Sequence, residues 1–267
     1  MMRMLRDWLI DPSVESLDVD GPGFSIAHRR VVQRKIMLRR LFESFYHRCR
    51  DIDLRYFGDC PGVRLEIGSG AGIMKDVFAD VITSDIKHLP FIDIVLSAER
   101  LPFRNNSLRA IYGINVFHHL PRPRAFFEEV IRVLHPGGGV VLVEPFYGPL
   151  ATWVFRNLHK SEGFDPEAPS WESSDEMGPF SKANQALSYV IFKRDRDSLD
   201  REFPQLDVVL KGPHTHVWYV TSGGVNFRQL LPDSFTPLVK FTERILSPFN
   251  RWIALQHTIV LRKKQIP

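Results

Sequence analysis

Three glycines at alternate positions, Gly68, Gly70 and Gly72 in the stretch LEIGSGAG, form the first group of residues whose spacing indicates chemistry. They follow an apolar run and precede a helical one, where glycine lets the backbone approach a ligand closely at a helix N-terminus. A dinucleotide-binding turn would carry a small residue in place of Ile73, and a phosphate-binding loop would carry a Lys-Ser/Thr pair that is absent here. A turn without a ligand is the third interpretation.

Two further groups of polar residues end later strand-like runs. Asp85 ends DVITSDI, where such folds place an acid against a ribose diol, and its carboxylate can accept hydrogen bonds from both hydroxyls. His118 and His119 follow LRAIYGIN at the carboxyl edge, where open α/β sheets bind ligands. Histidine is the commonest general base, so His118 is our first candidate for a catalytic role. The alternative is that one histidine packs while the other caps or faces solvent.

More polar candidates lie around two long irregular segments. They are Glu144, Tyr147, His159 and Glu162 around the first segment, and His214 and His216 in the second. The pair in HTH could supply two metal ligands, but spacing places no third ligand beside it. The sequence therefore predicts no metal site.

The elements that must position these residues alternate from Val63 onward. Strands are predicted in VRLEIG, DVITSDI, FIDIVLSA, LRAIYGIN, GGVVLVEP, LDVVLK and HTIVLRK, and helices in GIMKDVF and PRAFFEEVIRVL. This alternation predicts βαβ units and an open, mostly parallel α/β sheet flanked by helices.

The composition is that of an ordinary soluble globular protein, with 44% hydrophobic and 25% charged residues. No apolar run reaches the ~18 residues of a membrane span, and the N-terminus lacks a signal-peptide core. Cys49 and Cys60 form neither a disulfide framework nor a CxxC pattern. We therefore expect a cytoplasmic location.

An ordered set of motifs resembles the class I S-adenosylmethionine-dependent methyltransferases, type 11 branch. The motifs are LEIGSGAG, SDI, SAERLPFRNNSLRAIYGINVFHHL and EEVIRVLHPGGGVVLVEP, over residues 63–145. The resemblance implies a methyltransferase that uses S-adenosyl-L-methionine. It also implies a Rossmann-like methyltransferase sheet with an antiparallel last strand.

The resemblance assigns cofactor-binding roles to ten residues. On the methionine side they are the turn residues Gly68, Ser69, Gly70 and Gly72, with Glu66 near the amino group. On the nucleoside side they are Asp85 at the ribose, Ile86 at the adenine, Ala98 and Glu99 beside the purine, and Asn115 on the floor near the sulfonium.

Two positions depart from the family pattern. Family members usually carry Asp or Asn where Ser97 stands, so we expect a weaker or water-bridged contact with the adenine amino group. Asp85 lies 17 residues after Gly68, about one helical turn less than usual. The helix between them must therefore be short.

The chain is expected to divide into four parts. Residues 1–55 are a basic helical segment or lid, and residues 56–145 are the cofactor-binding core. Residues 146–205 are too long for an ordinary loop and are expected to cap the acceptor. Residues 206–267 complete the fold and contain a helical insertion.

Positive charge is concentrated in the first part. Eight arginines and lysines lie between His28 and Arg50 against the single acid Glu43. Apolar residues recur at helical spacing from about Ser25 to Asp53, which predicts one amphipathic basic helix. The basic block can face phosphates, an anionic membrane or water.

The acceptor is expected to be a small molecule, a lipid or a glycan-type compound methylated at oxygen. No nucleic acid is expected, because NVFHH stands where a (D/N)PP(Y/F) tetrapeptide for extruded bases would follow the fourth strand. The aromatic stretch FYGPLATWVFRNLHK would either shape an apolar acceptor pocket or pack as the core of a cap. The alternative function is a catalytically inactive cofactor-binding homologue with a regulatory or scaffold role.

Two basic amphipathic segments also suit a peripheral contact with an anionic membrane, at its inner surface. They are the N-terminal helix and FTPLVKFTERILSPFNRWIALQH. In the family that the chain resembles, an N-terminal helix commonly closes over the cofactor instead. Membrane contact is therefore a hypothesis, compatible with a lipid or lipid-linked acceptor.

Overall fold

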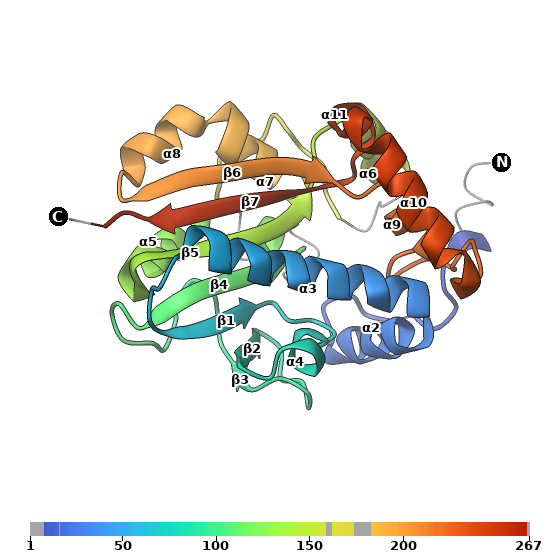
Figure 1. The fold of residues 1–267 in the computed structure, drawn as a ribbon, viewed down its shortest axis with the longest axis horizontal. Coiled ribbons are helices and arrows are strands. Elements are labelled where there is room, and N and C mark those ends of the chain that lie inside the picture. The colour runs from blue at the N-terminus through green and yellow to red at the C-terminus, as the bar shows by residue number, and fades with distance from the viewer. Residues whose placement is uncertain (1–7, 16, 159–161, 174–182, 266–267) are drawn as a thin grey trace.

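The computed structural model describes residues 8–15, 17–158, 162–173 and 183–265, and within them seven strands form one sheet (Figure 1). The strand order is β3-β2-β1-β4-β5-β7-β6. The strands are β1 (Val63–Ile67), β2 (Val81–Asp85), β3 (Ile94–Val95), β4 (Leu108–Ile114), β5 (Leu134–Pro145), β6 (Leu206–His214) and β7 (Gln256–Lys263). Strands β1 to β5 pair in parallel, and β7 is antiparallel to both β5 and β6. The predicted Rossmann-like sheet with an antiparallel last strand is confirmed.

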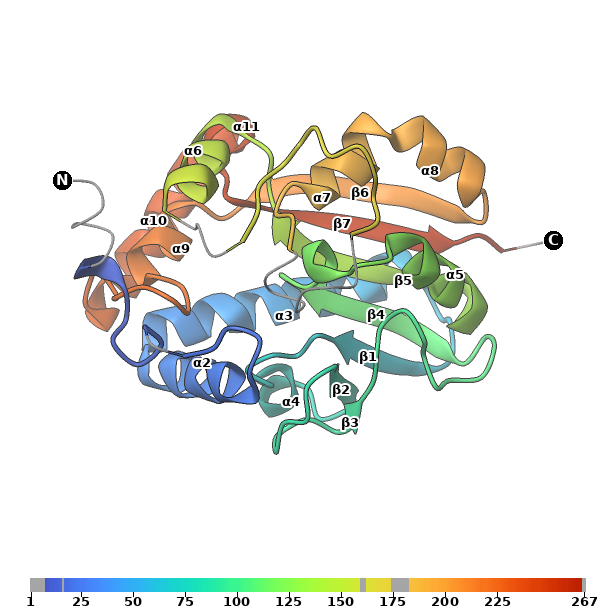
Figure 2. The same ribbon diagram turned by 180° about the vertical axis from the view of Figure 1, so that it is seen from behind.

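Helices cover both faces of this sheet (Figures 1 and 2). On one face lie α2 (Pro22–Arg34), α3 (Ile36–Tyr56) and α4 (Met74–Val77), and on the other α5 (Pro123–Val133), α7 (Leu187–Tyr189) and α8 (Arg196–Glu202). A third group gathers at the carboxyl edge of the parallel strands: α6 (Pro149–Asn157), α9 (Val217–Ser222), α10 (Thr236–Leu246) and α11 (Asn250–Ile253). None of the described helices has the length and apolar character needed to cross a membrane.

Two apolar clusters bury the sheet on its two faces. Met37, Leu41 and Phe45 of α3 belong to one cluster, and Phe126 and Phe127 of α5 belong to the other. A sheet buried on both sides needs apolar residues on both faces of its strands, which explains the continuous apolar runs in the sequence.

The N-terminal basic segment forms two helices rather than the one that was predicted. The helical conformation is interrupted between α2 and α3 at Lys35, whose backbone is extended. The side chain of Lys35 is buried, and its Nζ donates hydrogen bonds to the carbonyls of Gly224 and Phe227. The interruption thus coincides with contacts between this amine and a distant part of the chain. The helical periodicity of the sequence does not predict the interruption.

Several residues of the basic block are paired within the protein. Arg34 lies 2.6 Å from Asp11, Arg39 pairs with Glu43, and Arg50 donates two hydrogen bonds to Asp80. The first two pairs lie within the N-terminal segment, and the contact of Arg50 with Asp80 connects that segment to the cofactor-binding core predicted from the sequence.

The first insertion is residues 146–205. Two described parts of it lie at different places relative to the sheet. Helix α6 lies at the carboxyl edge, as expected for a cap (Figure 1). The segment from α7 through the π-helix Val190–Arg194 to α8 instead packs with α5 on the sheet (Figure 2). Its apolar side chains Leu187, Ile191 and Leu199 are almost completely buried. This part therefore completes the helical layer between β5 and β6 and differs from the expected cap.

Candidate active site

The glycine turn lies between β1 and α4, and all three glycines have positive φ, at 58°, 51° and 63°. A side chain at Gly68 would clash with Val116 and one at Gly72 with Phe91, at 2.1 and 2.5 Å from the added Cβ. At Gly70 the nearest atom would be 3.8 Å away. Two glycines therefore permit close packing of the turn, whereas the third faces open space that a ligand can enter.

Asp85 ends β2 directly beside this turn. Its Oδ2 accepts a hydrogen bond from the N–H of Gly70 at 2.9 Å, and its Oδ1 accepts one from the N–H of Lys87 at 2.9 Å. Each carboxylate oxygen can accept a further hydrogen bond, so a diol can still bind. The expected short helix is confirmed, since α4 has four residues.

A single cavity of about 560 Å³ extends from this turn to the histidines. It brings together most of the predicted site residues: Gly68, Gly70, Asp85, Ile86, Ala98, Glu99, Asn115 and His118. Asn115 has a φ of 51°, and its side-chain oxygen accepts a hydrogen bond from Gln256. Strained backbone of this kind is frequent at functional sites.

The remaining three predicted residues lie behind the turn rather than on the cavity wall. Ser69 ties the turn to β2, because its N–H donates to the carbonyl of Ser84 and its Oγ accepts from the N–H of Ser84. Gly72 packs against Phe91. Glu66 is buried, and burial raises the pKa of its carboxyl to about 8. Its role near an amino group stays a prediction.

The residues predicted to lie beside the adenine form a polar rim. The Oγ of Ser97 accepts a hydrogen bond from the N–H of Glu99 at 3.3 Å. The carboxylate of Glu99 accepts bonds from the backbone and the guanidinium of Arg122, at 2.7 and 2.9 Å. This rim lies beside the exposed side chain of Ile86, which offers an apolar surface to a flat ring.

Helix α2 lies over the glycine turn and closes the cavity. The guanidinium of Arg29 donates to the carbonyls of Ala71 and Gly72 at 2.8 and 2.9 Å, and Phe24 and His28 line the cavity. Sequence reasoning marked this segment as a lid but did not single out Arg29. Nothing in the basic pattern distinguishes it from its neighbours.

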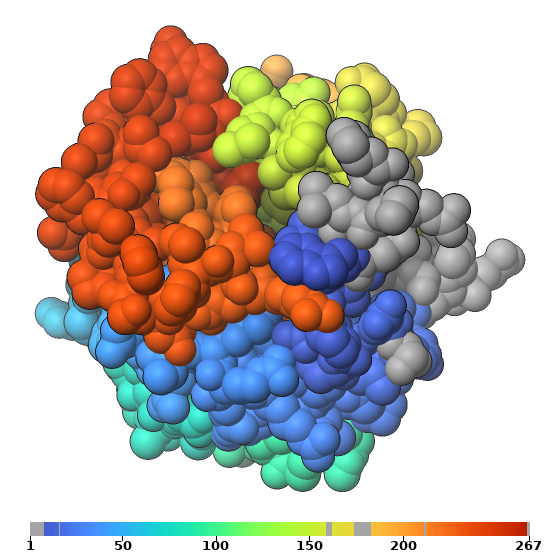
Figure 3. Space-filling model, turned by 90° about the vertical axis from the view of Figure 1, so that its right-hand side faces the viewer, coloured from blue at the N-terminus to red at the C-terminus, as the bar shows by residue number. Residues whose placement is uncertain are grey.

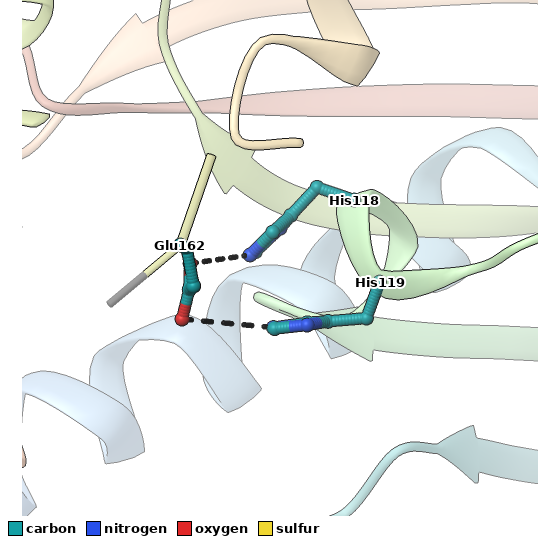
Figure 4. A group of neighbouring side chains, drawn as sticks. All are labelled: His118, His119 and Glu162. Carbon is teal, nitrogen blue, oxygen red and sulfur yellow. Dashed lines mark hydrogen bonds and ion pairs between the residues drawn. The ribbon is translucent and has the colours of Figure 1, made fainter. Parts of the chain in front are cut away.

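His118 lies at the opposite end of the cavity, in the 3-10 turn Phe117–His119. Its Nδ1 is 2.6 Å from Oε2 of Glu144, and its Nε2 is 3.3 Å from Oε2 of Glu162 (Figure 4). Burial lowers the pKa of His118, but the two carboxylates outweigh this effect and raise it to about 10. A protonated imidazole cannot accept a proton, so this arrangement argues against His118 as a general base. His118 lines the cavity, and its predicted place beside an acceptor stays a prediction.

The other histidines that the sequence singled out differ in the groups that they contact. His119 points toward the same carboxylate, with Nε2 3.9 Å from Oε1 of Glu162 (Figure 4). The rings of His214 and His216 have separate partners, Thr258 and Glu243, and do not converge on one point. His159 lies outside the described residues.

Apolar side chains form a further part of the cavity wall. Phe42, Phe155, Tyr219, Val225 and Leu255 line it. Among the described residues of the aromatic stretch, Phe155 lines the cavity, Phe146 and Tyr147 pack against other rings, and Trp153 is exposed. Whether this stretch shapes an acceptor pocket stays a prediction.

Comparison with known proteins finds a family model that matches the central part of the chain. Residues 65–142 match the model of a family described as methyltransferase domain. The match agrees with the resemblance to methyltransferases that the sequence motifs show over this part of the chain.

Curated relatives match stretches of this chain that differ in length. A probable phthiotriol/phenolphthiotriol dimycocerosates methyltransferase 2 of Mycobacterium ulcerans is 46% identical over 52 residues, covering 19% of this chain and 20% of the relative. A demethylmenaquinone methyltransferase of Renibacterium salmoninarum is 30% identical over 113 residues, covering 36% and 48%. A phthiotriol/phenolphthiotriol dimycocerosates methyltransferase of Mycobacterium tuberculosis is 29% identical over 125 residues, covering 43% and 40%. The matches thus span less than half the length of these relatives.

Among solved structures, a geranyl diphosphate methyltransferase in complex with SAM is similar over 96% of each chain. The TM-score is 0.51 and the sequence identity is 14%. At this identity the similarity concerns the fold alone, and it agrees with the sheet described above.

Proposed function

We propose that this chain, whose core matches the methyltransferase domain family, transfers a methyl group from S-adenosylmethionine to an oxygen of an apolar acceptor of the lipid or quinone type. The observation that carries the proposal is one continuous cavity with two unlike ends. One end carries the glycine turn and Asp85, and the other is apolar around a cluster of His118, His119 and Glu162.

The cofactor end fits S-adenosylmethionine in its chemistry. This molecule carries a ribose diol, an ammonium, a carboxylate and a cationic sulfur but no phosphate, and the turn offers no phosphate-binding lysine. Asp85 lies where a diol can donate to it, and the open face of Gly70 leaves room beside the turn. The arrangement of α2 over the turn supports a cofactor that is enclosed after it binds.

The bound cofactor would supply an electrophilic methyl group on a sulfonium sulfur. The acceptor oxygen forms the new O–C bond as the C–S bond breaks with its electron pair going to sulfur, and the hydroxyl proton passes to water. The contribution of this chain is alignment, because one cavity would hold both partners in line. The buried charges of His118 and Glu144 fix the polar end of that cavity.

The apolar wall and the relatives support the acceptor class. Phe155, Tyr219 and Leu255 would contact an apolar chain or ring, and a small polar glycan would leave these side chains without a partner. The names of the curated relatives include dimycocerosates and a menaquinone precursor.

A turnover assay tests this proposal. S-adenosylhomocysteine release is measured with a lipid extract, with a demethylated quinone and with soluble glycans as acceptors. We expect turnover with the lipid extract or the quinone, and none with the glycans. Cofactor binding without turnover on any fraction would support the alternative, a cofactor-binding homologue that has lost catalysis.

The exposed face of α10 and α11 supports the further proposal of a peripheral membrane contact. Leu238, Phe241 and Ile245 are 57–59% exposed and recur at helical spacing on α10. Phe249, in the 3-10 turn Ser247–Phe249, and Trp252, on α11, continue the exposed apolar surface. Figure 3 shows this end of the molecule, where these helices (orange to red) meet α6 (green) and the N-terminal helices (blue).

Charge on these two helices favours an anionic bilayer as the partner. Lys240, Arg244 and Arg251 are exposed, whereas Glu243 turns inward and accepts hydrogen bonds from the backbone of His216 and Trp218. An apolar helix face flanked by basic residues is the pattern of a helix that lies in the membrane interface. Such a contact would bring the cavity close to a lipid acceptor.

Liposome flotation tests the membrane contact. We expect the protein to float with anionic vesicles at low salt and to lose most of that binding in the double variant Phe241→Ser, Ile245→Ser. Leu54→Ser, at an equally exposed apolar position on α3, is the control and should bind like the wild type. Equal flotation of all three proteins, or none by the wild type, would remove this proposal.

A further inference from the structure

Three side chains at the polar end of the cavity converge on one point. The side chains are His118, His119 and Glu162, and one nitrogen or oxygen ligand atom of each lies within 4.8 Å of the others (Figure 4). Two come from the 3-10 turn after β4, and the third comes from the irregular segment after α6. The fold therefore brings Glu162 to two histidines although 44 residues separate it from His118 in the sequence. The sequence alone gives no sign of this contact.

The distances suit a shared metal ion. Four ligands at a zinc–nitrogen or zinc–oxygen distance of ~2.0–2.1 Å in a tetrahedron lie roughly 3.3 Å apart. Nε2 of His118 is already 3.3 Å from Oε2 of Glu162, and Nε2 of His119 is 3.9 Å from Oε1 of the same carboxylate. These two distances are to different oxygens of the carboxylate, and one ligand atom from each of the three side chains lies within 4.8 Å of the others. Closure around one ion would therefore need the side chains to move together to the tetrahedral spacing.

A second observation points to the same conclusion. Oε2 of Glu144 is 2.6 Å from Nδ1 of His118, and Oε1 of Glu144 also accepts hydrogen bonds from the N–H groups of Val116 and Phe117 at 2.9 Å. This carboxylate fixes the ring so that Nε2 points into the cavity toward Glu162. A carboxylate behind the far nitrogen of a histidine is the usual support of a metal-binding histidine.

We propose that His118, His119 and Glu162 bind one divalent transition-metal ion of the zinc type, with its remaining coordination position open to the cavity. The ion replaces the proton on Nε2 of His118, which is released to solvent, so zinc binding is accompanied by proton release. Two imidazoles and one carboxylate form a ligand set that selects zinc and its neighbours over magnesium and calcium, which prefer oxygen ligands alone. Glu144 is a positioning residue in this site.

The open position faces the space assigned to the methyl acceptor, so the role of the ion rests on the proposed function. A hydroxyl or quinol oxygen of the acceptor would bind there, and the ion would lower its pKa and orient it. The metal would thereby select acceptors that carry an oxygen, while the apolar wall would select the rest of the molecule. Binding of the ion itself depends only on the three ligands.

Calorimetric titration of the chelator-treated full chain with ZnCl2, and separately with MgCl2, tests the site. We expect one zinc ion per chain and no magnesium binding. His119→Ala and Glu162→Gln should each weaken zinc binding at least 100-fold, and Glu144→Gln should weaken it by ~10–100-fold. His88→Ala and Glu167→Gln, which change exposed residues of the same types, should bind zinc like the wild type.

A visible spectrum of the wild type with CoCl2 gives a readout that needs no variant. Intense d–d bands of low-coordinate cobalt, abolished by one equivalent of zinc, are expected. Absence of stoichiometric zinc binding, or zinc binding that survives in both ligand variants, would overturn the proposed site. Titration of the same samples with S-adenosylmethionine separates the two proposals. Cofactor binding without zinc binding overturns the metal site alone, whereas zinc binding without cofactor binding overturns the proposed function alone.

Discussion

Glu66 is a carboxyl group that the fold holds away from water behind the glycine turn. Its Oε2 has no hydrogen-bond partner among the described residues, and burial raises its pKa from an ordinary 4.5 to about 8. The folded protein therefore binds this proton more tightly than the unfolded chain does. Stability that depends on the proton is present at low pH and is lost as the pH rises from about 4.5 towards 8.

Glu66→Gln is expected to remove this pH dependence. Between pH 5.5 and 7.5 the cofactor-free wild type should lose about 2–3 kcal/mol of unfolding free energy relative to the variant, from ~1.4 kcal/mol per pH unit. Urea unfolding at both pH values measures the difference. A difference between the two proteins that stays constant with pH would show that Glu66 titrates normally in the folded state.

The sequence pointed to most of the residues that line one end of the cavity but not to the contacts among the polar residues at its other end. Gly68, Gly70 and Asp85 follow from a local pattern, because a turn between a strand and a helix has strict steric demands. Glu144 and Glu162 were named as candidates, yet their contacts with His118 depend on how β5 and the segment after α6 meet the turn after β4. Sequence spacing carries no information about such a meeting.

Among the elements, helix α2, which forms part of the lid, contacts the glycine turn through one side chain. Arg29 donates to two carbonyls of the turn, lies against Asp76 at 3.2 Å, and its guanidinium stacks over the ring of Phe91. Arg29 therefore supports the turn in the conformation that leaves Gly70 open.

Arg29→Ala is expected to weaken S-adenosylmethionine binding by about tenfold, equivalent to ~1.4 kcal/mol, because the lid and the turn lose a charge-assisted contact. The fold should persist, since α2 keeps its buried face. Arg30→Ala changes an exposed neighbour on the same helix and should leave affinity unchanged. Equal affinities of both variants, measured by calorimetry, would show that α2 does not act on the turn.

Prediction of elements succeeded where a segment has a strong local pattern. The sheet strands and α5 were predicted because apolar runs and helical periodicity define them. The break at Lys35 was missed because its cause lies in contacts across nearly 200 residues. The packing of α7 and α8 on the sheet was missed for a similar reason, since a long irregular stretch between them and β5 obscured their place in the layer.

For the molecule as a whole, the cavity lies between the sheet, α2 and the helices at the carboxyl edge. A ligand that fills it should therefore hold these parts together and stabilise the entire fold. Because the unfolded chain has no such cavity, binding adds RT ln(1 + [L]/Kd) to the unfolding free energy.

S-adenosylmethionine at a concentration of 100 times its Kd is expected to add ~2.7 kcal/mol and to raise Tm by roughly 5–10 °C. Differential scanning fluorimetry checks the shift, with ATP at the same concentration as a control that carries an adenosine and phosphates. A larger shift with ATP than with S-adenosylmethionine would indicate a nucleotide site instead.

Direct titration calorimetry with S-adenosylmethionine tests the central claim, that the glycine turn and Asp85 hold this cofactor. The account predicts one binding site per chain for the wild type. Asp85→Asn, which keeps one acceptor oxygen near the turn, should weaken binding at least tenfold without a large change in Tm. Asp59→Asn, at an exposed position, should bind like the wild type. No binding by the wild type, or equal affinity of Asp85→Asn and the wild type, would contradict the account.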